Sequence, residues 1–168
     1  AALNEAGGEL KKIAQYFYPF TGMGRRFQKV CEFNGITVYD DYAHHPTEIK
    51  AALQAAASKF GKENVVAVFQ PHRFTRLQSL WKEFITAFEN AGRVIVTDVY
   101  AASEDSIEGI NGENFAAELS CEYVSGNMQD VARKLMPSLK KGDVVIGLGA
   151  GTITNLGKEL CKLETILR

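Results

Sequence analysis

All three histidines of this chain fall in two short segments that also carry acids and arginines. Residues 40–47 read Asp-Asp-Tyr-Ala-His-His-Pro-Thr, and residues 69–76 read Phe-Gln-Pro-His-Arg-Phe-Thr-Arg. Each segment comes at the end of a run typical of a strand. In an open α/β sheet, loops at the carboxyl ends of parallel strands face one crevice, where ligands bind. Two such loops rich in ionisable groups therefore predict a site for a charged substrate.

Arg73 and Arg76 are three residues apart near the start of a predicted helix, a spacing that puts both on one helical face. Two guanidinium groups beside the free N–H groups of a helix start can bind a carboxylate or a phosphate. The alternative is two solvated arginines. Because the helix dipole favours acids at a helix start, two arginines there oppose it, and this conflict favours an anion-binding function.

Asp40 and Asp41 could bind a metal, a hydroxyl group or a base, or could cap the helix that follows them. A cap accounts for one acid but not readily for both. His44 and His45 are adjacent, so in an extended segment they point to opposite sides and do not chelate one ion together. A zinc site that adds His72 has no spacing signature, and we predict no metal site.

Residues 147–151, Gly-Leu-Gly-Ala-Gly, follow a predicted strand and open a predicted helix. Glycines at such a place let the backbone approach a phosphate closely. The dinucleotide fingerprint, however, requires glycine or alanine where this chain has Thr152. A tight strand-to-helix turn is therefore an equally good interpretation.

The bulk composition narrows the class of protein. The 168 residues suit one domain, and 46% apolar residues suit a folded core. Lys and Arg number 19 against 20 Asp and Glu, a balance that argues against nucleic-acid or membrane-surface partners. No apolar run approaches the ~20 residues that span a bilayer, and no signal peptide is evident. The three cysteines match no metal or disulfide pattern, so we expect buried free thiols and a cytoplasmic protein.

The hydrophobic pattern alternates strands and helices. Asn34 and Gly35 separate two strand-like runs and predict an antiparallel hairpin, because both turn positions need positive φ. The remaining apolar runs follow the helical or the strand period. Strands are expected over residues 27–33, 36–40, 65–69, 93–98, 122–124 and 144–148, and helices over 49–56, 77–88, 114–119, 128–139 and 153–163.

Repeated β-α units require parallel strands with helices on both faces. We expect an α/β fold, a Rossmann-like three-layer αβα arrangement of about six strands, mostly parallel, with one antiparallel strand from the N-terminal hairpin. Pro19, Gly22 and Gly24 indicate a break. We interpret residues 1–24 as the end of a preceding domain and a linker, and residues 25–168 as the domain itself.

The two histidine-bearing segments together are more specific than either alone. Residues 40–49, Asp-Asp-Tyr-Ala-His-His-Pro-Thr-Glu-Ile, and residues 69–76 resemble the C-terminal domain of the Mur ligase family. The resemblance covers residues 22–163 and is closest to the members that join L-alanine to UDP-N-acetylmuramate. Three shorter segments follow in the family's order: residues 24–27, 98–101 and 149–151.

The resemblance implies an enzyme that uses ATP to convert the carboxylate of a UDP-linked substrate into an acyl phosphate, which the amine of an amino acid then attacks. Full members have three domains, and the C-terminal one closes over the ATP site. ATP and Mg2+ are thus implied for the full-length enzyme, with L-alanine and UDP-N-acetylmuramate as further partners. The resemblance places Arg26 at a nucleotide phosphate and Asp41 at the ribose. The implied alanine pocket consists of Tyr42, His44, His72, Arg73 and Arg76.

The phosphate-binding loop Gly-x-x-x-x-Gly-Lys-Ser/Thr occurs nowhere in these residues. Since phosphoryl transfer depends on that loop and its Mg2+, we expect the isolated chain to be inactive and to bind no cofactor tightly. Three alternatives stay open. One is a murein-peptide recycling ligase, which shares the loop at residues 40–46 but lacks the Pro-His-Arg-x-Thr-Arg segment. The others are a stand-alone Rossmann-type nucleotide-binding module and a zinc hydrolase.

Overall fold

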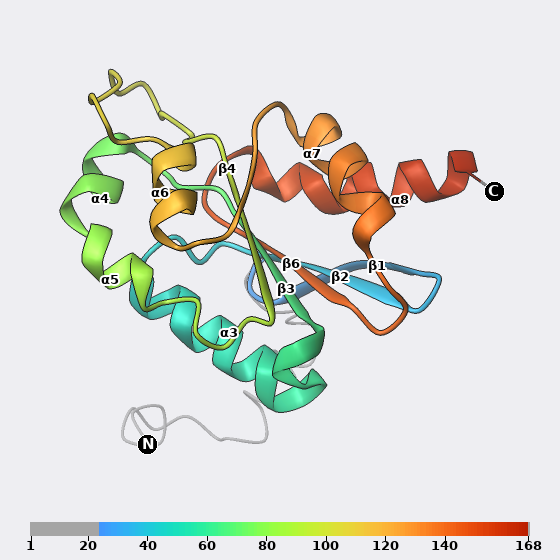
Figure 1. The fold of residues 1–168 in the computed structure, drawn as a ribbon. Helices are drawn as coiled ribbons and strands as arrows, with labels where there is room; N and C mark the ends of the chain where they lie inside the picture. Colours follow the sequence, from blue (N-terminus) through green and yellow to red (C-terminus); the bar gives the residue numbers. More distant parts are fainter. Residues whose placement is uncertain (1–23, 168) are drawn as a thin grey trace, which may run out of the picture.

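The structure, a computed structural model, describes residues 24–167, which form one sheet covered by helices (Figure 1). The strands follow the order β1-β2-β6-β3-β4-β5 across the sheet, and only β1 and β2 pair antiparallel. The strands are β1 (Gln28–Phe33), β2 (Ile36–Asp41), β3 (Val65–Phe69), β4 (Arg93–Thr97), β5 (Glu122–Val124) and β6 (Val144–Leu148). The helices are α3 (Pro46–Phe60), α4 (Phe74–Ser79), α5 (Trp81–Ile85), α6 (Gly112–Glu118), α7 (Met128–Leu135) and α8 (Leu156–Leu167), with short 3-10 turns at Lys62–Asn64, Met136–Ser138 and Thr152–Asn155.

The hairpin that opens the fold turns at the predicted dipeptide. Asn34 and Gly35 have φ values of 49° and 77°, and Phe33 pairs with Ile36 across the turn. β2 also pairs in parallel with β6, so the hairpin attaches β1 to the outer side of a parallel sheet. The predicted sheet, mostly parallel with one antiparallel strand, is confirmed.

Alternate residues of the central strands enter two separate hydrophobic clusters, one on each face of the sheet. On β3, Val65, Ala67 and Phe69 belong to the cluster that packs against α3, α5 and α6. Val66 and Val68 belong to the cluster formed with α7 and α8. Figure 1 shows these two groups of helices on opposite sides of the sheet, as the predicted three-layer arrangement requires.

The helix predicted over residues 77–88 is divided in two. Leu80, between α4 and α5, has φ −113° and ψ 19°, outside the helical range. Leu77 and Phe84 nevertheless both enter the same buried cluster. The period of apolar residues was therefore interpreted correctly, but the chain buries them with two short helices and a change of direction.

Cys31 in β1 and Cys161 in α8 form a disulfide across 130 residues of sequence. The prediction of three free thiols is therefore wrong for this pair, because α8 packs on the hairpin and brings the two residues together. Cys121 is the free thiol among the described residues, and burial raises its pKa to about 11. A thiol with such a pKa is protonated and unreactive at neutral pH.

Two further expectations meet the limits of the described residues. The break predicted at Pro19 and Gly22, and most of the segment interpreted as the end of a preceding domain and a linker, lie outside residues 24–167. The boundary between residues 24 and 25 therefore stays a prediction. Within residues 24–167, no helix combines the length and the apolar character needed to cross a membrane.

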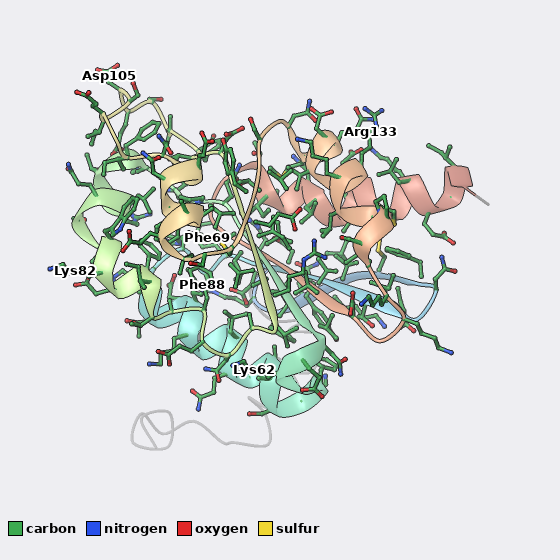
Figure 2. The ribbon with its side chains drawn as sticks, in the orientation of Figure 1. Lys62, Phe69, Lys82, Phe88, Asp105 and Arg133 are labelled. Atoms are coloured by element: carbon green, nitrogen blue, oxygen red, sulfur yellow. A yellow bond between two sulfur atoms is a disulfide. The ribbon has the colours of Figure 1, made fainter. Side chains whose placement is uncertain are left out.

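Phe69 offers a test of the larger cluster. Its ring lies 5.4 Å from the ring of Phe84 and 5.2 Å from that of Phe88, and Figure 2 shows it inside the molecule. We predict that Phe69→Ala lowers the free energy of unfolding by about 3–5 kcal/mol, because it leaves a cavity between sheet and helices. Ile166→Ala, at a side chain that is 76% exposed, should change it by less than about 0.5 kcal/mol. Urea unfolding followed by the fluorescence of the single tryptophan, Trp81, measures both.

The disulfide gives a second test. Reduction, or the variant Cys161→Ser, should lower the free energy of unfolding by about 2–5 kcal/mol, because the bond restricts the unfolded chain. Cys121→Ser should leave the effect of the reductant unchanged. Thiol titration of the unfolded, unreduced protein should detect Cys121 alone, and detection of all three cysteines would contradict the structure.

Candidate functional site

The loops that follow β2, β6, β3 and β4 lie next to one another along one edge of the sheet. Main-chain hydrogen bonds join neighbouring loops. The N–H of Gly149 donates to the carbonyl of Asp41 (3.2 Å), and that of Gln70 donates to the carbonyl of Leu148 (3.0 Å). The two histidine-bearing loops therefore meet, as expected, and together with the loops after β6 and β4 they bring the ionisable residues to one surface.

A row of rings crosses this surface. Tyr42 meets His44 edge-on at 5.0 Å between ring centroids, His44 meets His72 at 5.9 Å, and His72 stacks on Tyr100 at 5.5 Å. The guanidinium carbon of Arg25 lies 4.9 Å from the centroid of Tyr42. Tyr42 and Tyr100 are 37% and 38% exposed, so both ends of the row face solvent. We call Tyr42, His44, His72 and Tyr100 the ring row.

Arg76 binds the ring row directly. Its Nη1 lies 3.1 Å from Nδ1 of His72. Because a guanidinium can only donate, Nδ1 accepts this hydrogen bond and any proton on the neutral ring sits on Nε2. Burial lowers the pKa of His72, and the guanidinium groups of Arg76 and Arg73 lower it further. His72 is therefore neutral at pH 7.

Arg73 does not share a helical face with Arg76, contrary to the interpretation from spacing. It is the residue before α4, with φ 70°, in the left-handed region. Its side chain is 50% exposed, and its Nη1 lies 3.9 Å from Oε1 of Glu104. The structure nevertheless places both arginines at the start of α4, Arg73 just before the helix and Arg76 within it beside His72, with the guanidinium of Arg73 accessible to a ligand.

Glu48 in α3 links His44 to Arg26. It accepts the backbone N–H of His44 at 3.1 Å, while Nδ1 of the His44 ring lies 2.8 Å from the carbonyl oxygen of Tyr42. Nη1 of Arg26 lies 3.8 Å from the other carboxylate oxygen of Glu48. Burial alone would raise the pKa of Glu48, but these N–H groups and positive charges lower it on balance. Glu48 therefore stays ionised and holds two predicted site residues.

Asp40 and Asp41 are part of the interior rather than of the open surface. Asp41 is 5% exposed, and its two oxygens accept the backbone N–H groups of Ala43 (2.8 Å) and Phe27 (2.7 Å). Asp40 accepts from Nε of Arg25 at 2.9 Å. Both acids fix the segment that precedes β1, and Asp41 also holds the loop after β2. The contact of Asp41 with a ribose stays a prediction, and it would require exchange of these hydrogen bonds.

The cap of α3 is His45, whose Nδ1 accepts the N–H of Thr47 at 3.3 Å. The idea that an acid caps this helix is therefore wrong. His45 serves the helix, while its neighbour His44 joins the ring row, as expected for adjacent residues of an extended segment. Within residues 24–167, no group of three His, Cys, Asp or Glu side chains is arranged to hold a metal ion.

The glycine loop after β6 has a packing explanation. A Cβ on Gly151 would lie 2.5 Å from Cγ of Tyr100 and 2.6 Å from Oε1 of Gln70, so only glycine fits. Oε1 of Gln70 also accepts the N–H of Ile153 at 2.9 Å. These contacts favour the tight-turn interpretation of residues 147–151.

Several residues that shape this surface are not among the site residues predicted from the sequence. Tyr100 and Arg25 lie in segments that follow the family's order, without a predicted role. Glu48 and Glu104 have no predicted role either. Glu48 could have been found from its spacing, since it is one helical turn beyond His44. Glu104 gave no local signal, because its partner Thr75 is 29 residues away.

The sequence of this domain matches one known family. Residues 25–151 match the family described as "Mur ligase, glutamate ligase domain". The match covers most of the chain, and the chain therefore belongs to this family, as the resemblance of its two histidine-bearing segments indicated.

Individual relatives are more specific. The chain is 47% identical over 158 residues to a UDP-N-acetylmuramate–L-alanine ligase of Caldicellulosiruptor bescii, a match that covers 91% of this chain and 34% of the relative. A protein of the same name from Desulfotalea psychrophila is 43% identical over 162 residues, with 90% and 34% covered. The crystal structure of a UDP-N-acetylmuramate-alanine ligase from Thermotoga maritima gives a TM-score of 0.77 at 26% identity, covering 99% of this chain and 36% of that one. The chain thus spans about a third of the length of these relatives.

The protonation of His72 can be tested by NMR of the histidine ring signals. We predict that His72 titrates below its ordinary pKa of about 6.5, and that Arg76→Gln moves the pKa part of the way back, because burial remains. Since the folded-state pKa is the lower one, stability is full above the unfolded pKa and falls as the pH drops through it toward the folded pKa. Arg133→Gln, in α7 and away from the ring row, should leave the His72 titration unchanged, and an equal shift in both variants would contradict this account.

Proposed function

We propose that this chain is the amino-acid-presenting domain of an ATP-dependent ligase that joins L-alanine to UDP-N-acetylmuramate. The observation that carries the proposal is that Arg73 and Arg76, at the start of α4, lie beside the neutral ring of His72 at the carboxyl edge of the sheet. Relatives at 43–47% identity that bear this activity in their names support the choice of substrates.

The pair of arginines gives the amino acid its orientation. Their guanidinium groups are permanently charged and match a carboxylate in shape, so the carboxylate of L-alanine would bind there. The remaining predicted pocket residues, Tyr42, His44 and His72, would surround the small side chain and the amine with ring surfaces. Held in this way, the amine would face the acyl phosphate with little loss of orientational freedom at the moment of attack.

The other substrates would approach from the side of the hairpin. We propose that Arg26 contacts a nucleotide phosphate, because its guanidinium is exposed and only loosely paired with Glu48. Asp41 would lie at the ribose, supported by the resemblance alone. Bound ATP and Mg2+ would supply the phosphoryl group and neutralise its charge. The chain itself contributes cations and a fixed loop, since its sequence has no phosphate-binding loop of the Gly-Lys-Ser/Thr kind.

Two parts of the proposal concern the chain as a whole. We propose that residues 1–168 alone do not catalyse the ligation, because the phosphate-binding loop is missing from the sequence. We also propose the cytoplasm as the location, since ATP is supplied there. The Cys31–Cys161 disulfide would meet reducing conditions in that compartment.

The packing of Gly151 leaves the alternative function, a stand-alone nucleotide-binding module, without a supporting observation.

The decisive experiment measures L-alanine-dependent phosphate release by the full-length protein with ATP and UDP-N-acetylmuramate. Arg73→Ala and Arg76→Ala should each raise the KM for L-alanine by at least about thirtyfold, because a charged hydrogen bond to the carboxylate is lost, while the KM for ATP stays nearly constant.

Arg133→Ala removes a similar charge from α7, on the other face of the sheet from α3 and α5 (Figure 2), and serves as the control. A rise in the KM for ATP, with the KM for L-alanine unchanged, would mean that the two arginines bind the nucleotide and not the amino acid. Turnover by residues 1–168 alone would overturn the proposal that the isolated chain is inactive.

A further inference from the structure

Two loops of the site carry backbone strain where they face each other. Arg73 has φ 70°, and Ala102 and Ser103 have φ 50° and 68°. Residues with a Cβ are unfavourable in this left-handed region and persist there only when the surrounding contacts hold them. Ala102 and Ser103 form a tight turn that the N–H of Glu104 closes onto the carbonyl of Ala101 at 3.1 Å. The turn places the Glu104 side chain against the start of α4.

Glu104 takes the place of a helix cap. Arg73, the residue before α4, offers no capping side chain to the residues described here. The two oxygens of Glu104 instead accept the hydroxyl of Thr75 at 2.7 Å and its backbone N–H at 3.1 Å. These hydrogen bonds from Thr75 lower the pKa of Glu104. A carboxylate from a distant loop therefore satisfies a free N–H group of the helix start.

The same two loops are also joined through the backbone. The N–H of Arg73 donates to the carbonyl of Tyr100 at 2.9 Å, and the N–H of Tyr100 donates to the carbonyl of Pro71 at 2.8 Å. The Tyr100 ring stacks on His72 in the ring row. The loop from Tyr100 to Glu104 therefore holds the chain on both sides of Arg73. Tyr100 is hydrogen-bonded to Pro71 and to Arg73 itself, and Glu104 is hydrogen-bonded to Thr75.

These hydrogen bonds determine the position of the Arg73 guanidinium. Its Nη1 stays 3.9 Å from Glu104, too far for a hydrogen bond, and half of the side chain is exposed. The carboxylate of Glu104 thus attracts the guanidinium without occupying its donors. Those donors remain available to the carboxylate of a ligand.

We propose that Glu104 is a positioning residue of the amino-acid site: through Thr75 it holds the strained backbone of Arg73, and so keeps the Arg73 guanidinium facing the incoming carboxylate. Glu104 itself does not touch the substrate. This inference rests on the proposed function, because it assigns Arg73 to the amino acid.

The test uses the full-length protein and separates the KM for L-alanine from kcat. Glu104→Ala should raise the KM for L-alanine about tenfold, while kcat and the KM for ATP change less than about twofold, because the lost hydrogen bonds fix only the alanine-binding loop. Asp105→Ala removes the same charge one residue later. Asp105 is exposed, makes no hydrogen bond or ion pair with the described residues and points away at the tip of its loop (Figure 2). The KM of the Asp105→Ala variant for L-alanine should therefore stay within about twofold of that of the unmodified protein.

The partner residue supplies the second arm. Thr75→Ser keeps the hydroxyl and should behave like the unmodified protein, whereas Thr75→Val should raise the KM for L-alanine. The double variant of Glu104→Ala with Thr75→Val should have the same KM for L-alanine as Glu104→Ala alone, because Glu104→Ala already removes the hydrogen bond that Thr75→Val deletes. Independent, multiplying effects, or a Glu104→Ala variant with an unchanged KM, would overturn the positioning role.

A readout without activity separates this inference from the proposed function. Failure of the unmodified protein to respond to L-alanine would reject the function. Hydrogen exchange of the Thr75 amide then decides the role of Glu104, since that amide is bonded to it. We expect exchange at least about tenfold faster in Glu104→Ala than in Asp105→Ala. Equal exchange rates of the Thr75 amide in the two variants would show that Glu104 does not hold this loop.

Discussion

The position of β6 between β2 and β3 is the constraint on which the rest of the structure depends. β6 pairs in parallel with both strands, and Leu148 is in register with Asp41 on one side and Phe69 on the other. The loops that follow β2 and β3 therefore leave the sheet at the same level. The contact between His44 and His72, which joins the two halves of the ring row, requires this common level, and β6 provides it with an entirely buried apolar strand.

Polar side chains in the interior hold the loops, and exposed ones remain for a ligand. Asp41 and Gln70 are almost fully buried, and their side chains form hydrogen bonds with backbone and side-chain groups of the same and neighbouring loops. Asp98 likewise accepts from the hydroxyl of Ser125 and the N–H of Gly126, which ties the end of β4 to the segment after β5. With these groups satisfied, the half-exposed guanidinium of Arg73 has, among residues 24–167, a single ion-pair partner, Glu104, at 3.9 Å. Such a division suits a rigid surface that orients a small charged molecule.

The family assignment and the geometry support the same function from independent directions. The match over residues 25–151 rests on sequence, whereas the accessibility of Arg73 and the neutral state of His72 rest on tertiary contacts. The chain spans about a third of the length of the relatives that it matches. Its surface suits binding and orientation, and the chemistry of phosphoryl transfer would lie with residues outside this sequence.

The sequence by itself determined the strands, the hairpin at Asn34–Gly35, the two-sided sheet and the family, because hydrophobic period and turn geometry act over a few residues. It also located the loops that meet. Only the tertiary structure decided that Arg73 lies outside its helix, that Asp41 is engaged by backbone N–H groups, and that Cys31 meets Cys161. It alone revealed Glu104 against Thr75. These contacts join residues that are distant in sequence or depend on a strained backbone, and packing against other elements fixes them where local preference does not.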